Sequence, residues 1–380
     1  MGCGRRAWML KLLLLVVVAL AAVEYLFGLR TYLGTPAFNI TQSTIETDVR
    51  KSQPWFNLPL FIQNTLSQNS TQSMTGQNGT EYVRTPHLLN KIMESLRNLV
   101  SEDTTQVNEQ SMPVCDEVPP DLGPVTANKT EMELDWVEKK YPEVDSGGFY
   151  SPPNCTARHK VAIIVPFRDR HQHLAIFLNH MHPFLMKQQI EYGIFIVEQN
   201  DTSAFNRAKL MNIGFVESQK KKPGGWQCFI FHDIDLLPLD SRNLYSCPEQ
   251  PRHMSASIDK LKFTLPYDGI FGGVSAMTLE QFTKVNGFSN RYWGWGGEDD
   301  DMFHRMKKMH YHITRYNMSI AVYTMLDHEE SAPNPKRFKL LLETSKTLEK
   351  DGLSTLKYDL VHVEQHHLYT HVLANIDERS

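Results

Sequence analysis

The sequence shows little charge imbalance and no internal repeat. Its 380 residues carry 39 Lys and Arg against 43 Asp and Glu, a formal net charge of −4. A dedicated nucleic-acid-binding protein would show a basic excess, so we expect no nucleic-acid partner. Hydrophobic residues make up 41% of the chain and charged residues 22%, which is enough to bury a sizeable core. The body of the chain is therefore predicted to be one folded domain.

Cysteine is also scarce, with only five residues and no CxxC pair, which argues against a zinc site. Cys3 precedes an apolar N-terminal run, and the other four follow it, namely Cys115, Cys155, Cys228 and Cys247. An even number on one side of a membrane anchor predicts two disulfides in an oxidising compartment. Four buried thiols are the alternative interpretation.

The N-terminal segment has the pattern of a signal-anchor. Arg5, Arg6 and Lys11 precede an apolar run at 12–29 that contains one charge, Glu24. This pattern predicts a cytoplasmic tail at 1–11, a membrane span at 12–29 and a lumenal body. A cleaved signal peptide is the alternative, because residues 19–21 have the A-x-A form of a cleavage site. Both interpretations place the body in the secretory pathway.

A polar segment at 30–114 is predicted to be a lumenal stem, because its Ser, Thr, Gln and Asn bury too little apolar surface to fold. Residues 86–100 form an amphipathic pattern within it, and a homodimer through the anchor or stem is an expectation. The chain has seven N-x-S/T sequons, and we expect glycans at Asn39, Asn69, Asn78 and Asn128.

From residue 115 onward, apolar strands alternate with helical patterns. Strands are predicted at 161–165, 193–197 and 228–231, with helices at 174–185 and 205–215 between them. This order predicts a parallel sheet with right-handed crossovers, whose ligands bind at the carboxyl ends of the strands. Further helices are predicted at 279–285, 299–309 and 335–350, the last with Asn334 as its N-cap and Gly352 just past its end.

A pair of acids, Asp233 and Asp235, directly follows the third strand. On an extended segment, residues i and i+2 point to the same side, so both carboxylates would face one site. Two such carboxylates repel each other unless a cation lies near them, and carboxylate oxygens suit Mg²⁺ or Mn²⁺. By itself D-x-D is a weak motif that also fits a solvated turn.

A second cluster, YWGWGGEDDD, spans 292–301. Its glycines permit unusual backbone angles and hinge motions, and its two tryptophans offer flat apolar area to a sugar. The four acids at 298–301 open a helix, where negative charge is favourable, and helix capping explains part of the cluster. We expect one of the acids to serve as a general base.

Met325 and His328 form a third candidate pair. Thioether and imidazole groups bind transition ions, although such a pair is more often made of packing and surface residues.

The order and spacing of several segments resemble the β-1,4-galactosyltransferase family over roughly 115–376. These segments are PFRDR (166–170), FNRAK (205–209), CFIFHDIDLLP (228–238), PRH (251–253), LPYDGIFGGVSAMT (265–278), NGF (286–288), YWGWGGEDDDMFHR (292–305) and NPKRF (334–338). The resemblance implies a GT-A fold, which is a Rossmann-like mixed sheet flanked by helices, in a catalytic domain at 115–380. It also implies an Mn²⁺-dependent, inverting transfer from a UDP-sugar to the 4-hydroxyl of a GlcNAc-terminated glycan, in a type II Golgi membrane protein.

The resemblance also implies roles for single residues. Asp235, Met325 and His328 correspond to the metal ligands, Asp233 to a residue that helps hold the donor, and Asp299 to the catalytic base. Glu298 corresponds to a catalytic and donor-contacting residue beside it. The other substrate contacts implied are Pro166, Phe167, Arg168, Arg170, Phe205 and Arg207 for the nucleotide, Tyr267 and Ile270 for the donor sugar, and Trp295, Arg337 and Phe338 for the acceptor. The implied disulfides are Cys115–Cys155 and Cys228–Cys247.

Two positions depart from the family pattern. Asp169 stands where Asn is expected, and its charge is unfavourable near a diphosphate unless it faces away or pairs with Arg170. Ile270 stands where galactose-transferring members carry an aromatic residue, usually Tyr, beside the C2 substituent of the donor. An aliphatic residue opens space for an acetamido group and resembles the invertebrate β-1,4-N-acetylgalactosaminyltransferases. We therefore expect UDP-GalNAc as the donor, with UDP-Gal as the alternative.

Two other classes of function compete with a transferase. A membrane-tethered lectin need not keep the ligand set or the base, so the presence of Asp235, Met325, His328 and Asp299 argues for activity. A metal-dependent phosphoesterase would need a second ligand set, which the sequence lacks.

Overall fold

The computed structural model describes residues 112–222, 225–329 and 331–377, which belong to one compact unit, Val107–Ser380. The expected tail, anchor and nearly all of the stem, with Asn39, Asn69 and Asn78, lie outside the described residues. The described part begins slightly before the expected boundary at 115. Val114 bridges to Thr156, and the backbone N–H of Cys115 donates to the Thr156 carbonyl at 3.0 Å.

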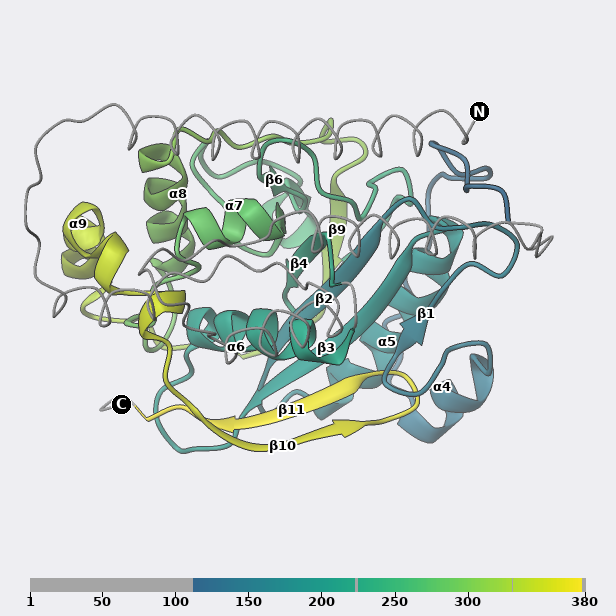
Figure 1. The fold of residues 1–380 in the computed structure, drawn as a ribbon, viewed down its shortest axis with the longest axis horizontal. Coiled ribbons are helices and arrows are strands. Elements are labelled where there is room, and N and C mark those ends of the chain that lie inside the picture. Colours follow the sequence, from purple (N-terminus) through teal and green to yellow (C-terminus); the bar gives the residue numbers. More distant parts are fainter. Residues whose placement is uncertain (1–111, 223–224, 330, 378–380) are drawn as a thin grey trace, which may run out of the picture. The chain divides into compact units, whose positions relative to one another are not determined.

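The centre of the fold is a sheet whose three middle strands are parallel (Figure 1). They are β2 (Lys160–Phe167), β3 (Glu191–Gln199) and β4 (Cys228–His232), in the order β3-β2-β4. Their apolar residues are buried on both faces, which is typical of a parallel sheet covered on both sides. The three strands predicted from the sequence are confirmed.

The complete sheet is mixed, because antiparallel pairing occurs on both sides of these strands. On one side β4 pairs antiparallel with β8 (Val274–Thr278), which pairs antiparallel with β6 (Arg252–His253). On the other side a C-terminal hairpin, β10 (Asp359–Gln365) and β11 (Thr370–Asn375), joins through β11 parallel to β3, whose beginning pairs with β1 (Phe149–Tyr150). The mixed sheet implied by the resemblance is confirmed. The parallel sheet expected from the strand–helix order is confirmed for its three predicted strands, but β1, β6, β8 and β10 pair antiparallel.

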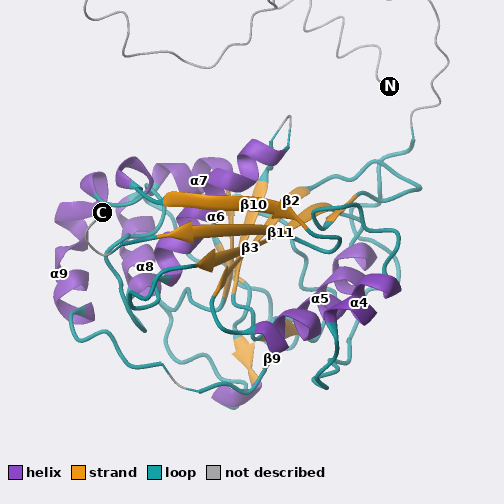
Figure 2. Ribbon diagram, turned by 90° about the horizontal axis from the view of Figure 1, so that it is seen from below, coloured by secondary structure: helices purple, strands orange, loops and turns teal. Residues whose placement is uncertain are grey.

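Helices cover the two faces of this sheet, and alternating strand residues separate the two cores. Ile163 faces a core that includes α5 (His171–Lys187) and α4 (Leu134–Lys140), whereas Ile164 faces α6 (Arg207–Lys221), α7 (Leu279–Lys284) and α8 (Glu298–Lys308). Figure 2 shows α4 and α5 lying together on one side of the strands. Helices on both faces of the sheet leave the carboxyl ends of its strands as the open edge.

A small second sheet continues from the end of β4. It contains β5 (Leu236–Pro238), β9 (Val322–Met325) and β7 (Ser257–Ile258), with a short 3-10 turn, η1 (Asp259–Leu261), after β7. β9 is the middle strand, antiparallel to β5 and parallel to β7.

The last predicted helix starts later than expected. The structure has α9 (Arg337–Thr347), followed by the 3-10 turns η2 (Leu348–Lys350) and η3 (Leu353–Thr355). Asn334 is therefore not the N-cap. Its side-chain oxygen accepts from the backbone N–H of Lys336 at 2.9 Å, which forms a turn before the helix instead.

Both disulfides implied by the resemblance are present, Cys115–Cys155 and Cys228–Cys247. The second connects the first residue of β4 to the loop after β5. In the part of the chain that the structure describes, no helix has the length and apolar character to cross a membrane.

Candidate active site

The acidic pair lies at the carboxyl edge of the sheet, in a turn rather than on an extended segment. The backbone N–H of Asp233 donates to Gly273 O at 3.2 Å, and that of Leu236 donates to Asp233 O at 3.3 Å. The two carboxylates nevertheless lie close enough to interact. Burial raises the pKa of both Asp233 and Asp235, and the charge of Asp235 raises the pKa of Asp233 further. The extended geometry predicted from sequence is wrong, but the predicted electrostatic conflict is present.

Strand pairing brings the other two predicted metal ligands to this turn. Met325 is in register with Leu236, and the backbone N–H of Leu326 donates to Asp235 O at 2.8 Å. The chain then places His328 Nε2 at 2.8 Å from Asp235 Oδ2. Asp235 and His328, which are 93 positions apart in sequence, therefore meet because β5 and β9 are neighbours.

The hydrogen bonds of His328 fit a metal site. Its Nδ1 lies 2.9 Å from the carbonyl oxygen of Glu329, which can only accept, so Nδ1 carries a proton. In the neutral ring the Nε2 lone pair then faces a carboxylate oxygen of Asp235. Two electron pairs this close require a positive charge between them, either a proton or a cation.

Four side chains from other elements hold this ligand segment. Asp259 Oδ1 accepts from the backbone N–H of Met325 at 3.0 Å, and Lys129 Nζ donates to the carbonyl of Met325 at 3.0 Å. Lys260 donates to Leu326 O at 3.3 Å, and His173 Nε2 lies 3.1 Å from Asp327 O. Sequence analysis missed all four, and no local motif marks them.

Arg207 joins the acidic pair to the second cluster. Its Nε donates to Asp233 Oδ1 at 2.6 Å, and its Nη1 donates to Glu298 Oε1 at 3.4 Å. The other oxygen of Glu298, Oε2, is buried and has no hydrogen-bond partner among the described residues. Burial and the neighbouring Asp299 raise the pKa of Glu298 to about 7, although Arg207 opposes the shift. An unpartnered buried acceptor of this kind fits a ligand hydroxyl.

The four acids in the first turn of α8 have different surroundings. Glu298 contacts Arg207, and Asp300 accepts a hydrogen bond from the Tyr267 hydroxyl at 2.9 Å. Asp301 is buried, and its Oδ2 accepts from Arg305 Nε at 2.5 Å. The remaining acid, Asp299, is half-buried. Burial and the charge of Asp300 raise the pKa of Asp299. The helix-capping interpretation is therefore insufficient, because each carboxylate has its own environment.

Gly272 makes room for Asp299. A Cβ atom at this position would lie 2.9 Å from Asp299 Oδ2, which is closer than real Cβ atoms approach. The glycine pair 272–273 of the FGG motif thus keeps the carboxylate of Asp299 close to the backbone before β8, beside the turn that holds Asp233.

The predicted nucleotide contacts follow β2 and β3. Arg168 Nη1 donates to Ser203 O at 2.8 Å, and its guanidinium lies 5.2 Å from the centre of the Phe205 ring. Pro166 and Phe167, in contrast, are buried in the last positions of β2, so Phe167 offers its side chain to the core rather than to an open surface. Arg170, just before α5, lies near enough to Asp235 for its charge to oppose the rise in the pKa of that carboxyl.

The structure accounts for the departure at Asp169. This residue has φ = 54°, a left-handed conformation that Asn and Asp tolerate better than most residues. Its side chain is 89% exposed, and its nearest cationic partner is Arg168 at 3.9 Å rather than Arg170. The added charge therefore faces solvent.

The predicted acceptor residues meet at the glycine-rich loop. The backbone of Trp295 pairs with the segment before α9, since Asn334 N donates to Trp295 O at 2.8 Å. The guanidinium of Arg337 lies 5.7 Å from the centre of the Trp295 ring and 4.7 Å from that of Phe338. Trp295 is 60% exposed and Phe338 67% exposed, so the two rings offer apolar surface to a ligand.

Ile270 is held in a turn beside the acidic cluster. Its backbone N–H donates to Tyr267 O at 3.3 Å, and its carbonyl accepts from Arg315 Nη2 at 2.8 Å. Arg315 Nε in turn donates to His253 Nδ1 at 3.0 Å, so Arg315 links the PRH motif to this loop. The Ile270 side chain itself is half-buried.

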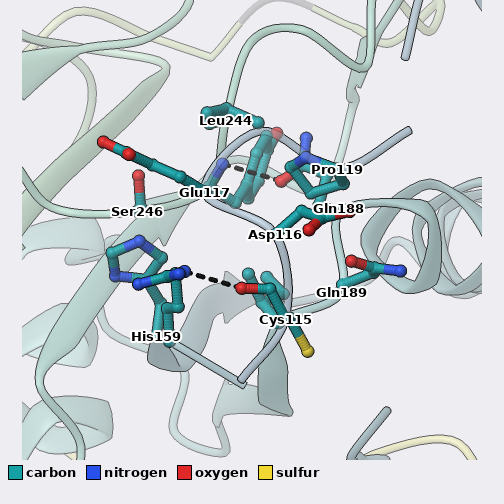
Figure 3. A pocket seen from close by; sticks show the side chains of 12 residues that line it. Cys115, Asp116, Glu117, Pro119, His159, Gln188, Gln189, Leu244 and Ser246 are labelled. Carbon is teal, nitrogen blue, oxygen red and sulfur yellow. Dashed lines mark hydrogen bonds between the residues drawn. The ribbon is translucent and has the colours of Figure 1, made fainter. Parts of the chain in front are cut away.

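Figure 3 shows a separate pocket near the amino ends of β2 and β3. It is lined by residues that include Cys115, Asp116, His159, Gln189 and Ser246. None of the predicted metal, catalytic or substrate-binding residues lines it, so it is distinct from the cluster at the carboxyl edge.

Comparisons with known proteins agree with this arrangement. Residues 115–248 match the family model described as the N-terminal region of glycosyl transferase group 7, and residues 252–329 match the model described as the N-terminal domain of galactosyltransferase. The chain is 45% identical over 271 residues to β-1,4-galactosyltransferase 1 of Mus musculus, covering 70% of this chain and 67% of that protein. It is 43% identical over 272 residues to β-1,4-galactosyltransferase 2 of Mus musculus, covering 70% and 73%.

Solved structures are similar as well. The catalytic domain of Drosophila β-1,4-galactosyltransferase 7, in complex with xylobiose, is 30% identical at a TM-score of 0.51 and covers 58% of this chain and 94% of that one. A mutant of the same enzyme, in complex with manganese, UDP-Gal and xylobiose, is 31% identical at a TM-score of 0.49, with the same coverage. On sequence identity and coverage, the chain belongs to the β-1,4-galactosyltransferase family.

Proposed function

We propose that this protein is an inverting, Mn²⁺-dependent β-1,4-glycosyltransferase that moves GalNAc from UDP-GalNAc to the 4-hydroxyl of a terminal GlcNAc on a glycolipid or glycoprotein. The observation that carries the proposal is the contact of Asp235 with His328 at 2.8 Å. It lies at the end of β4 beside Asp233, which Arg207 links to Glu298. Family membership supports the reaction type.

The donor set fits manganese. Asp235, His328 and Met325 would supply a carboxylate oxygen, an imidazole nitrogen and a thioether sulfur. The proposed set contains two such residues and a methionine, and among the described residues no three His, Cys, Asp or Glu side chains are placed to hold a metal. When bound, Mn²⁺ would supply positive charge against the diphosphate of the leaving group.

The protein's own residues would carry the proton transfer. Asp299, in its ionised form, accepts the proton of the acceptor 4-hydroxyl as that oxygen forms a bond to the anomeric carbon of the donor. The bond from that carbon to the diphosphate breaks, and its electron pair leaves with UDP. Because Gly272 keeps the position near Asp299 free of a side chain, the carboxylate has room to face an acceptor.

Other residues would orient the two substrates. Glu298 Oε2, which lacks a partner among the described residues, would accept a sugar hydroxyl, and Arg207 would keep Glu298 and Asp233 in place. Arg168 and Phe205 would contact the nucleotide, and Trp295 with Phe338 would cover the apolar face of the acceptor.

The choice of GalNAc over galactose depends on Ile270. The similar proteins from Mus musculus are named galactosyltransferases. Within the family an aromatic residue at this position accompanies galactose transfer. Ile270 is half-buried and smaller than Tyr, so it would leave space for the acetamido group of GalNAc. UDP-Gal is the alternative donor.

A comparison of both donors with a GlcNAc acceptor tests this proposal. We expect wild-type protein to prefer UDP-GalNAc in kcat/KM, and Ile270→Tyr to shift the preference toward UDP-Gal by about tenfold or more, because one added group in an apolar pocket changes discrimination by that order. Ile270→Leu is the matched control and should keep the wild-type preference. A wild-type protein that strongly favours UDP-Gal, unchanged in Ile270→Tyr, would refute the donor assignment.

We also propose that the protein is a single-pass type II membrane protein of the Golgi with a lumenal catalytic domain. The basic residues before the apolar run at 12–29 support this orientation. Both disulfides support an oxidising compartment. Asn128, the one favoured sequon among the described residues, is exposed and accessible to a glycan.

A further inference from the structure

A chain of buried hydrogen bonds begins at His232, the last residue of β4, whose side chain is fully buried. Its Nδ1 lies 2.8 Å from the carbonyl oxygen of Asp233, which can only accept, so Nδ1 donates. Burial lowers the pKa of His232 to about 3, and the ring is neutral. Its Nε2 therefore accepts from the Tyr245 hydroxyl at 2.9 Å.

The chain continues across to β9. The hydroxyls of Tyr245 and Tyr323 are 3.0 Å apart, and because Tyr245 gives its proton to His232, Tyr323 donates to Tyr245. Asn243 Nδ2 donates to the Tyr323 hydroxyl and also to Met254 O, both at 3.2 Å. The Met254 carbonyl sets the orientation of the amide, because turning the amide over would oppose two oxygens. Every proton thus points one way, from Asn243 toward the peptide after His232.

This chain links both halves of the candidate metal site. At one end it holds the carbonyl of Asp233, in the turn that presents Asp233 and Asp235. Further along the chain, Tyr323 precedes Met325 by two positions on β9, so their side chains share a face of the strand. The disulfide between Cys228 and Cys247 anchors the loop that carries Tyr245 to the start of β4.

We propose that His232, Tyr245 and Tyr323 are positioning residues that set the turn after β4 and the strand β9 in the geometry needed to hold the metal ion. This inference rests on the proposed function, since it concerns the same site. None of the three residues touches substrate in the proposed reaction. Their role is to keep the two separate ligand segments at a fixed distance from each other, which a chain of directional hydrogen bonds does better than apolar packing alone.

The test is a titration of the full-length protein with Mn²⁺ in the presence of UDP. The electron paramagnetic resonance signal of free Mn²⁺ measures how much of the ion is bound. Tyr245→Phe removes one oxygen and leaves His232 Nε2 without a donor. We expect Mn²⁺ affinity to fall about three- to tenfold, since hydrogen-bond partners beyond the metal ligands have effects of this order or larger. Tyr245→Phe combined with Tyr323→Phe should weaken binding by little more than Tyr245→Phe alone, because both substitutions break one chain.

The fold offers a matched control in Tyr192. This tyrosine of β3 is also fully buried, and its hydroxyl lies 2.8 Å from His182 Nδ1, while His182 Nε2 lies 3.0 Å from Leu368 O. Tyr192→Phe therefore removes the same kind of bond near the amino end of β3. It should lower the melting temperature but leave Mn²⁺ affinity unchanged.

The possible outcomes distinguish failure of the positioning role from failure of the proposed metal site. Tyr245→Phe with wild-type Mn²⁺ affinity, whatever its melting temperature, would overturn the positioning role and leave the metal site intact. Equal losses in Tyr245→Phe and Tyr192→Phe would also overturn it, since the effect would then be one of general stability. Wild-type protein without any Mn²⁺ binding would refute the metal site itself, and the positioning role with it.

Discussion

The two sides of the candidate active site are built by different means. On the side of the proposed metal ligands, strand pairing and buried hydrogen bonds hold the chain, as in the bond of the Leu326 N–H to Asp235 O at 2.8 Å. On the acceptor side, residues 292–297 form a loop with three positive-φ glycines, and Trp295 is 60% exposed. Gly297 is the N-cap residue of α8 and has φ = 96°. A Cβ atom at this position would lie 2.8 Å from a ring atom of Tyr292.

We infer from this difference that the two sides of the site have different roles in the reaction. Groups that stabilise charge on a leaving diphosphate work best when they are fixed before the reaction. A cover over an acceptor must open for exchange, and glycines absorb the backbone changes this requires. Substitutions on the metal side should therefore abolish binding or chemistry, whereas those on the loop should mainly change the affinity for the acceptor.

The largest effect is expected at the base. Asp299→Asn keeps the shape of the side chain but removes its ability to take a proton, so kcat should fall by about 10²- to 10⁴-fold. Binding of UDP, measured by calorimetry, should stay close to wild type. Near-normal transfer by this variant would show that another group is the base, and loss of UDP binding would show that the substitution disturbed the donor side.

A smaller but still large effect is expected for the metal ligand. Asp235→Asn should weaken Mn²⁺ binding by about 10²-fold, because even the hydrogen-bond partners of ligands contribute about 10- to 100-fold. The measurement is a titration of Mn²⁺ with UDP present. Asp327→Asn is the control, since the Asp327 side chain is fully exposed and pairs with Lys260, and its affinity should match wild type. Equal behaviour of the two variants would contradict the ligand assignment.

On the loop side, Trp295→Ala should raise the KM for the acceptor by about five- to tenfold, because one exposed indole contributes on the order of 1 kcal/mol of stacking. The KM for the donor should change less than twofold. Initial rates at varied acceptor and donor concentrations separate the two constants. A rise in the donor KM of the same size would mean that the two sides of the site are not independent.

The smallest effect is a shift in pH dependence. The charge of Asp300 raises the pKa of Asp299, and a base with a raised pKa loses activity sooner as pH falls. Asp300→Asn removes that charge and keeps an acceptor for the Tyr267 hydroxyl. The acidic limb of the kcat/KM profile should therefore move to lower pH. A limb that stays in place would indicate that Glu298, with its pKa of about 7, controls it instead.

Much of the site could be predicted from the sequence, because its motifs are local. The strand before Asp233, the glycine-rich loop and the acidic run each appear as short continuous segments. The roles proposed for Met325 and His328 as metal ligands could be predicted only through the family resemblance, since nothing in their own segment indicates that β9 will pair with β5. The bonds from Lys129, Asp259 and His173 that hold this segment come from distant parts of the chain and leave no local signal.

The three central strands, their intervening helices and the family could all be inferred without a structure, because buried runs and motif spacing are encoded in contiguous residues. Long-range packing places the C-terminal hairpin beside β3, and it also places Asp301 in the core with Arg305 while Asp299 faces Gly272. Successive residues of a helix point in different directions, and the elements packed around that helix decide which carboxylate is buried and which faces the site.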